Sequence, residues 1–144
     1  MRAEAQNIEL LALGTPDNSL RVGARPATRP LPGNERWFEV RIEAEAHPFS
    51  GVMEETFPSS ALVEWSGTLE KEPPARYVLG GWRAAELTLE VEPPEGAQQG
   101  QQLVVEVTLV RSGDDPWPLL RYLIFNVEPF SQRTRAAIDD LLAL

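Results

Sequence analysis

A chain of 144 residues, 42% hydrophobic and 24% charged, is expected to fold as one globular domain over residues 1–144. Its 22 acidic side chains outnumber the 13 basic ones, and the net charge of -9 disfavours nucleic acid and anionic membranes as partners, because both require a cationic surface. Cysteine is absent from the sequence, which excludes disulfides and favours a reducing compartment.

The N-terminus carries Glu4 and Asn7 where a signal peptide would begin its apolar segment, and the longest apolar runs are too short to cross a membrane. We therefore expect a cytoplasmic protein. Lys71 is the single lysine, and the many arginine, alanine, leucine and proline residues are typical of a GC-rich bacterial genome.

The first 35 residues predict one or two strands followed by a proline-rich loop. Residues 7–13 read as a strand and residues 19–22 as a short second one, separated by turn residues. Residues 23–34 contain three prolines, each of which removes a donor from a sheet ladder, so we expect a loop there. The remaining residues, 36–144, would form the sheet and helix core.

A hairpin and a helix are expected next. Residues 36–46 alternate between apolar and charged side chains from Phe38 onward, as in a half-solvated antiparallel strand, and residues 51–57 resume as its partner after a turn at His47. A helix is expected to follow Pro58, with a serine side chain capping its first amides. Its apolar stripe consists of Leu62, Trp65 and Leu69.

The second half of the chain predicts strands and a final helix. Residues 76–79 and 85–92 read as strands, and residues 103–111 as a central strand with one face in the core. Residues 119–127 are apolar on both parities, which predicts a strand covered on both faces. A helix with a stripe of Ile138, Leu141 and Leu142 ends the chain.

The order of strands, helix, strands and helix predicts an α+β fold. We expect a twisted antiparallel sheet of about six to seven strands with two helices packed on one face. The last three strands are joined by short links and should form a meander.

Part of this pattern resembles a known bacterial family. The residues that carry the resemblance are the run Trp37-Phe38-Glu39-Val40-Arg41-Ile42, the hairpin containing Phe49-Ser50-Gly51, the helical stripe described above, and the glutamate-studded strands before the last helix. Over residues 36–144 the chain is similar to small uncharacterised WapI-like domains, some of which are described as immunity proteins encoded beside toxin genes. The resemblance implies a non-enzymatic protein that binds a protein partner.

The sequence offers little for catalysis or metal binding. His47 is the only histidine, and one histidine without cysteine cannot supply a usual zinc or copper site. Gly80-Gly81 lacks the lysine of a phosphate-binding loop, and no Gly-x-Ser-x-Gly motif occurs. We therefore expect no enzyme activity, no metal and no cofactor.

Two groups of side chains are candidates for binding a protein partner. Outward glutamates would form an acidic sheet face that attracts a basic partner: Glu86, Glu90 and Glu92 on one strand, with Glu43 and Glu45 on another. The alternative reading is a solvated surface. The tryptophans Trp37, Trp82 and Trp117 lie off the core pattern and are the second group, because exposed tryptophans often mark contacts. The alternative for these is that they plug the ends of the sheet.

Three other functions stay open at this point. An apolar cavity between sheet and helices, lined by Phe125, Tyr122 and Trp65, would make the protein a carrier of small apolar ligands. An enzyme using carboxylates alone would need two glutamates in a cleft with raised pKa values. An uncovered strand edge would allow a homodimer.

Overall fold

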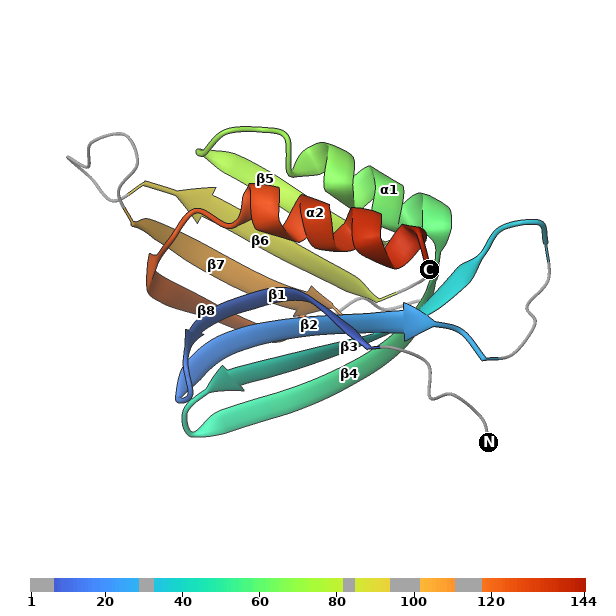
Figure 1. Ribbon diagram of the computed structural model, residues 1–144. Coiled ribbons are helices and arrows are strands. Elements are labelled where there is room, and N and C mark those ends of the chain that lie inside the picture. The colour runs from blue at the N-terminus through green and yellow to red at the C-terminus, as the bar shows by residue number, and fades with distance from the viewer. Residues whose placement is uncertain (1–6, 29–32, 82–84, 94–101, 111–117) are drawn as a thin grey trace.

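The computed structural model describes residues 7–28, 33–81, 85–93, 102–110 and 118–144 (Figure 1). The described residues form two four-stranded antiparallel sheets and two helices, so the α+β class is confirmed. The expected single sheet of six to seven strands is wrong. Each sheet is a meander, because every strand pairs with the strand that follows it in sequence.

The first sheet, sheet 1, has the order β1-β2-β3-β4. Its strands are β1 (Ile8–Thr15), β2 (Asn18–Pro26), β3 (Trp37–Ala46) and β4 (Phe49–Pro58). The prediction of a loop from residue 23 is wrong for its first part, since β2 continues to Pro26, which pairs with Phe38. Pro26 is tolerated because its nitrogen points away from β3, on the side where the pairing with β1 stops at Ala24.

The second sheet, sheet 2, has the order β5-β6-β7-β8. Its strands are β5 (Ala75–Gly80), β6 (Glu86–Glu92), β7 (Leu103–Val110) and β8 (Pro118–Val127). The expected central strand is confirmed, as β7 pairs with both β6 and β8. The prediction that β8 is covered on both faces is wrong, because Leu123 and Phe125 on its outer face are 43% and 58% exposed.

The helices are α1 (Ser59–Thr68) and α2 (Ser131–Leu142). Both apolar stripes are confirmed, with Leu62, Trp65, Ile138 and Leu141 buried. The expected serine cap is wrong. The amide of Ser60 instead donates to the Glu35 carboxylate, at 3.2 Å, which satisfies one orphan donor of the first turn.

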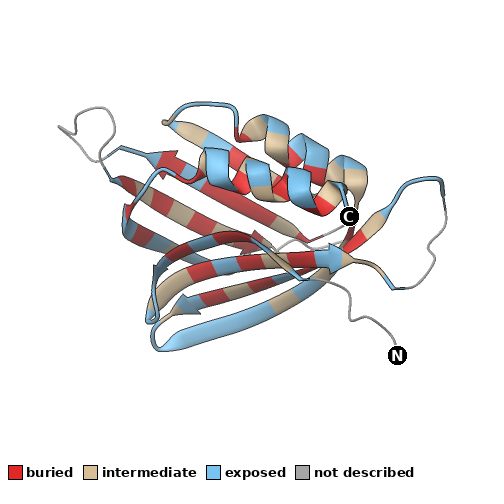
Figure 2. Cartoon of the chain, in the orientation of Figure 1, coloured by how far each residue is buried: buried red, intermediate tan, exposed pale blue. Residues whose placement is uncertain are grey.

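The two halves of the chain interlock through their helices. Helix α1 follows sheet 1 but packs on β5, while α2 follows sheet 2 but packs on β1, and the two helices touch one another (Figure 1). Strand β8 also lies beside β1. The buried faces of both sheets therefore share one core with the helices, visible as the red stripes in Figure 2.

Candidate functional site

The outer faces of the sheets, which point away from the shared core, carry most of the candidate residues. On sheet 2 these are Glu86, Glu90 and Glu92 of β6, which alternate with the buried Leu87, Leu89 and Val91. Glu43 and Glu45 lie on the outer face of β3 in sheet 1. The structure thus divides the predicted acidic face between two sheets.

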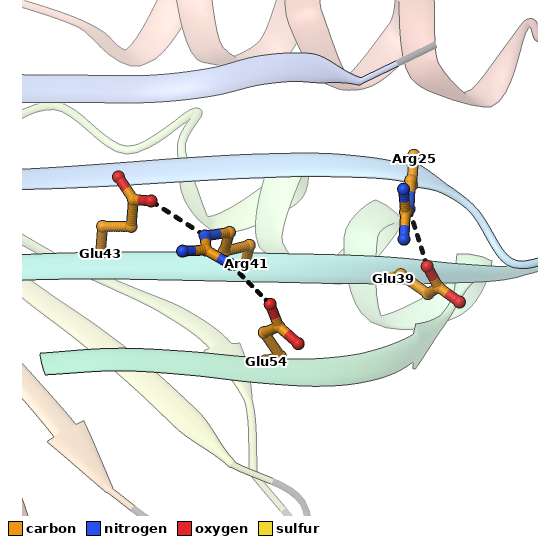
Figure 3. Close-up of polar contacts among 5 residues, drawn as sticks. All are labelled: Arg25, Glu39, Arg41, Glu43 and Glu54. Atoms are coloured by element: carbon orange, nitrogen blue, oxygen red, sulfur yellow. Dashed lines mark hydrogen bonds and ion pairs between the residues drawn. The ribbon is translucent and has the colours of Figure 1, made fainter. Parts of the chain in front are cut away.

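Sheet 1 places arginines in the middle of its outer face, which compensate the glutamates around them (Figure 3). Arg41 of β3 donates from Nε to Glu43 at 2.9 Å and from Nη1 to Glu54 of β4 at 2.7 Å. The hydrogen bond to Glu43, with that to Glu54, raises the pKa of the Arg41 guanidinium. Arg25 of β2 donates to Glu39 at 2.7 Å. A hollow of about 510 Å³ lies among these pairs, beside the small Gly23.

Sheet 2 has the opposite arrangement, with glutamates in the middle and arginines at the margins. Glu90 of β6 lies directly opposite Glu106 of β7, a like-charged cross-strand pair. Arg121 on β8 contacts one oxygen of Glu106, from Nε at 2.9 Å and from Nη2 at 2.7 Å. Arg76 on β5 is 3.9 Å from Glu90, at the limit of an ion pair. Like charges directly opposite one another destabilise a sheet, and only part of that cost is compensated here.

The individual glutamates of β6 differ in their surroundings. Glu92 is exposed at the end of the strand, opposite Val104. Glu86 is half-buried, accepts a hydrogen bond from Thr88 Oγ1 at 2.9 Å, and lies so close to Gly81 that a Cβ there would be 3.0 Å from its carboxylate. Glu86 therefore supports the turn before β6, and Glu90 and Glu92 are the more accessible pair.

Two apolar side chains adjoin this acidic region, and the sequence analysis did not identify them as surface residues. Leu123 of β8 lies opposite Glu106, and Phe125 follows on the same face. The apolar run of β8 predicted burial because sequence periodicity cannot distinguish a covered strand from an edge strand with exposed apolar residues. We call Glu90, Glu92, Glu106, Leu123 and Phe125 together the acidic-apolar patch.

The remaining candidates lie elsewhere. Trp37 is half-buried where β3 begins, beside a hollow of about 660 Å³ near the start of α1, and its indole Nε1 is buried without a hydrogen-bond partner among the described residues. Trp82 and Trp117 lie outside the described residues. Glu45 is exposed near Tyr122, where β8 meets sheet 1.

The residues suggested for an apolar cavity do not come together. Trp65 is fully buried in the core, whereas Phe125 points outward. The Tyr122 hydroxyl donates to the Ser19 carbonyl at 2.7 Å, and burial, with a smaller contribution from the Glu45 charge, raises its pKa. These three side chains therefore give no support to a common ligand cavity.

Within the described ranges, no group of three His, Asp or Glu side chains is arranged to hold a metal ion. None of the helices described is both long and apolar enough to span a membrane.

No protein-family model matches the chain, and neither the curated proteins nor the solved structures contain a significant match. The resemblance to WapI-like domains therefore stays a prediction.

Proposed function

We propose that the protein is a non-enzymatic interaction module that binds a basic protein through the acidic-apolar patch of sheet 2. The observation that carries the proposal is the cross-strand pair of Glu90, which is exposed, and Glu106, which is half-buried and contacts Arg121. A cationic side chain placed between these carboxylates relieves their repulsion and gains charge-assisted hydrogen bonds. An immunity-type role, in which the patch covers the basic surface of a toxin, is the specific form of this proposal.

The exposed apolar side chains strengthen the argument. Interfaces usually combine an apolar centre with a polar rim, and exposed apolar side chains grouped on one face mark such sites. Leu123 and Phe125 would supply buried contact area, while Glu90 and Glu92 would steer the encounter with a basic partner. The net charge of -9 extends the same attraction to longer range.

The test is a pull-down from lysate of the native host at low and high salt, with mass spectrometry of the retained proteins. Wild type is compared with Glu90→Lys/Glu92→Lys. The matched control is Asp139→Lys/Asp140→Lys, which makes the same charge change on the exposed side of α2. We expect a basic protein that is retained by wild type and the control, released by salt, and lost from the β6 variant. Equal retention by the β6 variant would show that the patch is not the binding site.

A further inference from the structure

The two sheets have four outer strands, and natural proteins usually protect such strands from pairing with other chains. Three of the four are protected. Strand β1 is covered by α2 and has a register shift after Glu9. Strand β8 lies beside β1, has two register shifts, and bends at Asn126, whose φ is +57°. Strand β5 has only six residues and is covered by α1.

Strand β4 lacks these protections over most of its length. All ten of its residues pair in unbroken register with β3. Figure 2 shows β4 exposed along most of its length, with only the end nearest α1 covered. Among the described strands it is therefore the long, regular and accessible edge, which is the kind of edge to which an extended segment adds.

The register also fixes which backbone groups of β4 face outward. Ala46 and Phe49 pair across the two turn residues His47 and Pro48, so Phe49 is bonded to β3. Because hydrogen bonding alternates along an edge strand, the residues of the other parity direct their amides and carbonyls away from β3. These residues are Ser50, Val52, Glu54 and Thr56.

The side chains of β4 indicate the chemistry of its occupant. Phe49 and Val52 are 67% and 57% exposed at one end of the accessible stretch. Glu54, which accepts a hydrogen bond from Arg41 at 2.7 Å, and its neighbour Glu55 lie further along and point to opposite faces. A second copy of the chain would bring another net charge of -9 to this edge, whereas a basic segment complements it.

We propose that β4 accepts an extended segment of a basic partner protein as a fifth strand of sheet 1. In antiparallel pairing, two adjacent basic residues of the segment lie opposite Glu55 and Glu54, one on each face, and apolar residues lie opposite Val52 and Phe49. The sign of the partner's charge rests on the proposed function, but the location does not, because β4 and the acidic-apolar patch belong to different sheets.

The probe is a blocked synthetic peptide, Thr-Arg-Arg-Thr-Val-Thr-Thr-Val, titrated into the isotope-labelled full chain and followed by amide NMR shifts. A peptide with both arginines replaced by glutamate is the charge control. We expect shifts concentrated on the outward amides of β4, and binding weakened about tenfold or more for the charge control.

Proline variants test the backbone pairing directly. Val52→Pro removes one outward donor and leaves the bonds between β3 and β4 in place, so we expect it to fold and to bind the peptide about tenfold more weakly. Ser50→Pro is a second variant of the same kind. Val52→Thr keeps the amide and the preference for strand, and should bind within about twofold of wild type.

The outcomes separate this inference from the proposed function. An absence of shifts on β4 up to millimolar peptide, or equal binding by both proline variants, would overturn the inference. Shifts confined to the acidic-apolar patch and abolished by Glu90→Lys/Glu92→Lys would overturn it while supporting the proposed function. If the β4 amides shifted with protein concentration in the absence of peptide, a second copy of the chain would be the occupant. That result would overturn the proposal that β4 binds a basic segment. Peptide binding on β4 that survives Glu90→Lys/Glu92→Lys supports the inference independently of the patch.

Discussion

The two halves of the molecule repeat one order of elements, four antiparallel strands and a helix, but present different surfaces. On sheet 1, Arg41 lies in the middle of the outer face between Glu43 and Glu54. On sheet 2, the arginines that contact glutamates stand on the outer strands, and the middle strands carry the acidic side chains. The comparison teaches that the position of the arginines, rather than the number of glutamates, decides which sheet face stays acidic.

In the core, unlike on their outer faces, the two halves are alike and depend on one another. Each helix packs against the first strand of the other half, so neither half contains its own cover. Contacts across the halves reinforce this arrangement. Arg135 of α2 lies 2.8 Å from Glu70 after α1, and the Tyr122 hydroxyl of β8 donates to the Ser19 carbonyl of β2 at 2.7 Å. The outer surfaces of the two halves therefore differ, while the interior is common to both.

The largest expected effect on stability comes from substitutions in the core that the two halves share. Trp65→Ala removes a fully buried side chain of α1 and should destabilise the protein by about 3–5 kcal/mol. Ile138→Ala in α2 should cost about 2–5 kcal/mol. Urea unfolding followed by circular dichroism, with hydrogen exchange at β3 and β6, should show both sheets destabilised together by either change. If one sheet unfolded alone, the halves would be independent domains.

The next prediction concerns the contact between the sheets at Tyr122. Burial raises the pKa of its hydroxyl above the ordinary value of 10.0, so the folded state keeps the proton at a pH where the unfolded chain loses it. The stability from this group is complete below pH 10 and should fall above it by about 1.4 kcal/mol per pH unit.

Urea unfolding between neutral and alkaline pH measures this effect, with Tyr122→Phe as the comparison. The variant loses the hydrogen bond to Ser19 at every pH, about 1 kcal/mol, but should lack the additional alkaline slope. Identical slopes for wild type and variant would mean that Tyr122 titrates alike in the folded and unfolded states.

Much of the fold could be predicted from local pattern. The alternation around Phe38, Val40 and Ile42 and the stripe of Leu62 and Trp65 were sufficient for a strand and a helix, because each element buries one face. The division into two sheets could not be predicted, since strand pairing across α1 depends on contacts between distant residues. The end of β2 was missed because Pro26 was read as a breaker rather than as a terminal strand residue.

The candidate surface was predicted in composition but not in arrangement. The alternation of apolar and polar residues along β6 correctly placed Glu90 and Glu92 outside the core. It does not tell which residues of neighbouring strands lie opposite one another. The register determines that Glu90 faces Glu106, whereas Arg41 faces Glu54. The difference between a compensated and an acidic face is therefore a property of strand pairing.

A smaller effect is expected at the helix starts, where the halves also differ. Glu35, distant in sequence, accepts from the Ser60 amide at the start of α1. Glu35→Ala should destabilise the protein by about 0.5–1 kcal/mol, because an orphan amide loses its acceptor and the helix dipole loses a nearby anion.

Glu128→Ala is the matched control for this prediction. Glu128 precedes α2 and is likewise exposed, but the start of α2 has no side-chain cap hydrogen bond among the described residues. Thermal unfolding should show a lower midpoint for the first variant and little change for the second. Equal shifts would indicate a general charge effect instead of a cap.

The smallest expected effect on stability, and the most direct test of the comparison, comes from removing the central arginines of sheet 1. Arg25→Gln/Arg41→Gln breaks exposed ion pairs, which contribute little to folding. It should nevertheless make the outer face of sheet 1 resemble that of sheet 2, because Glu39, Glu43 and Glu54 lose their counter-charges. In wild type, a trilysine peptide should shift amides near Glu90 and Glu106 at low salt, and in the variant it should also shift those near Glu39 and Glu43, away from the edge strand β4. New shifts on sheet 1 would show that arginine placement alone separates the two faces. Shifts near Glu39 and Glu43 in wild type would show that the ion pairs of Arg25 and Arg41 do not shield the face of β3. A mobile cation would then compete successfully with a guanidinium that lies 2.9 Å from Glu43.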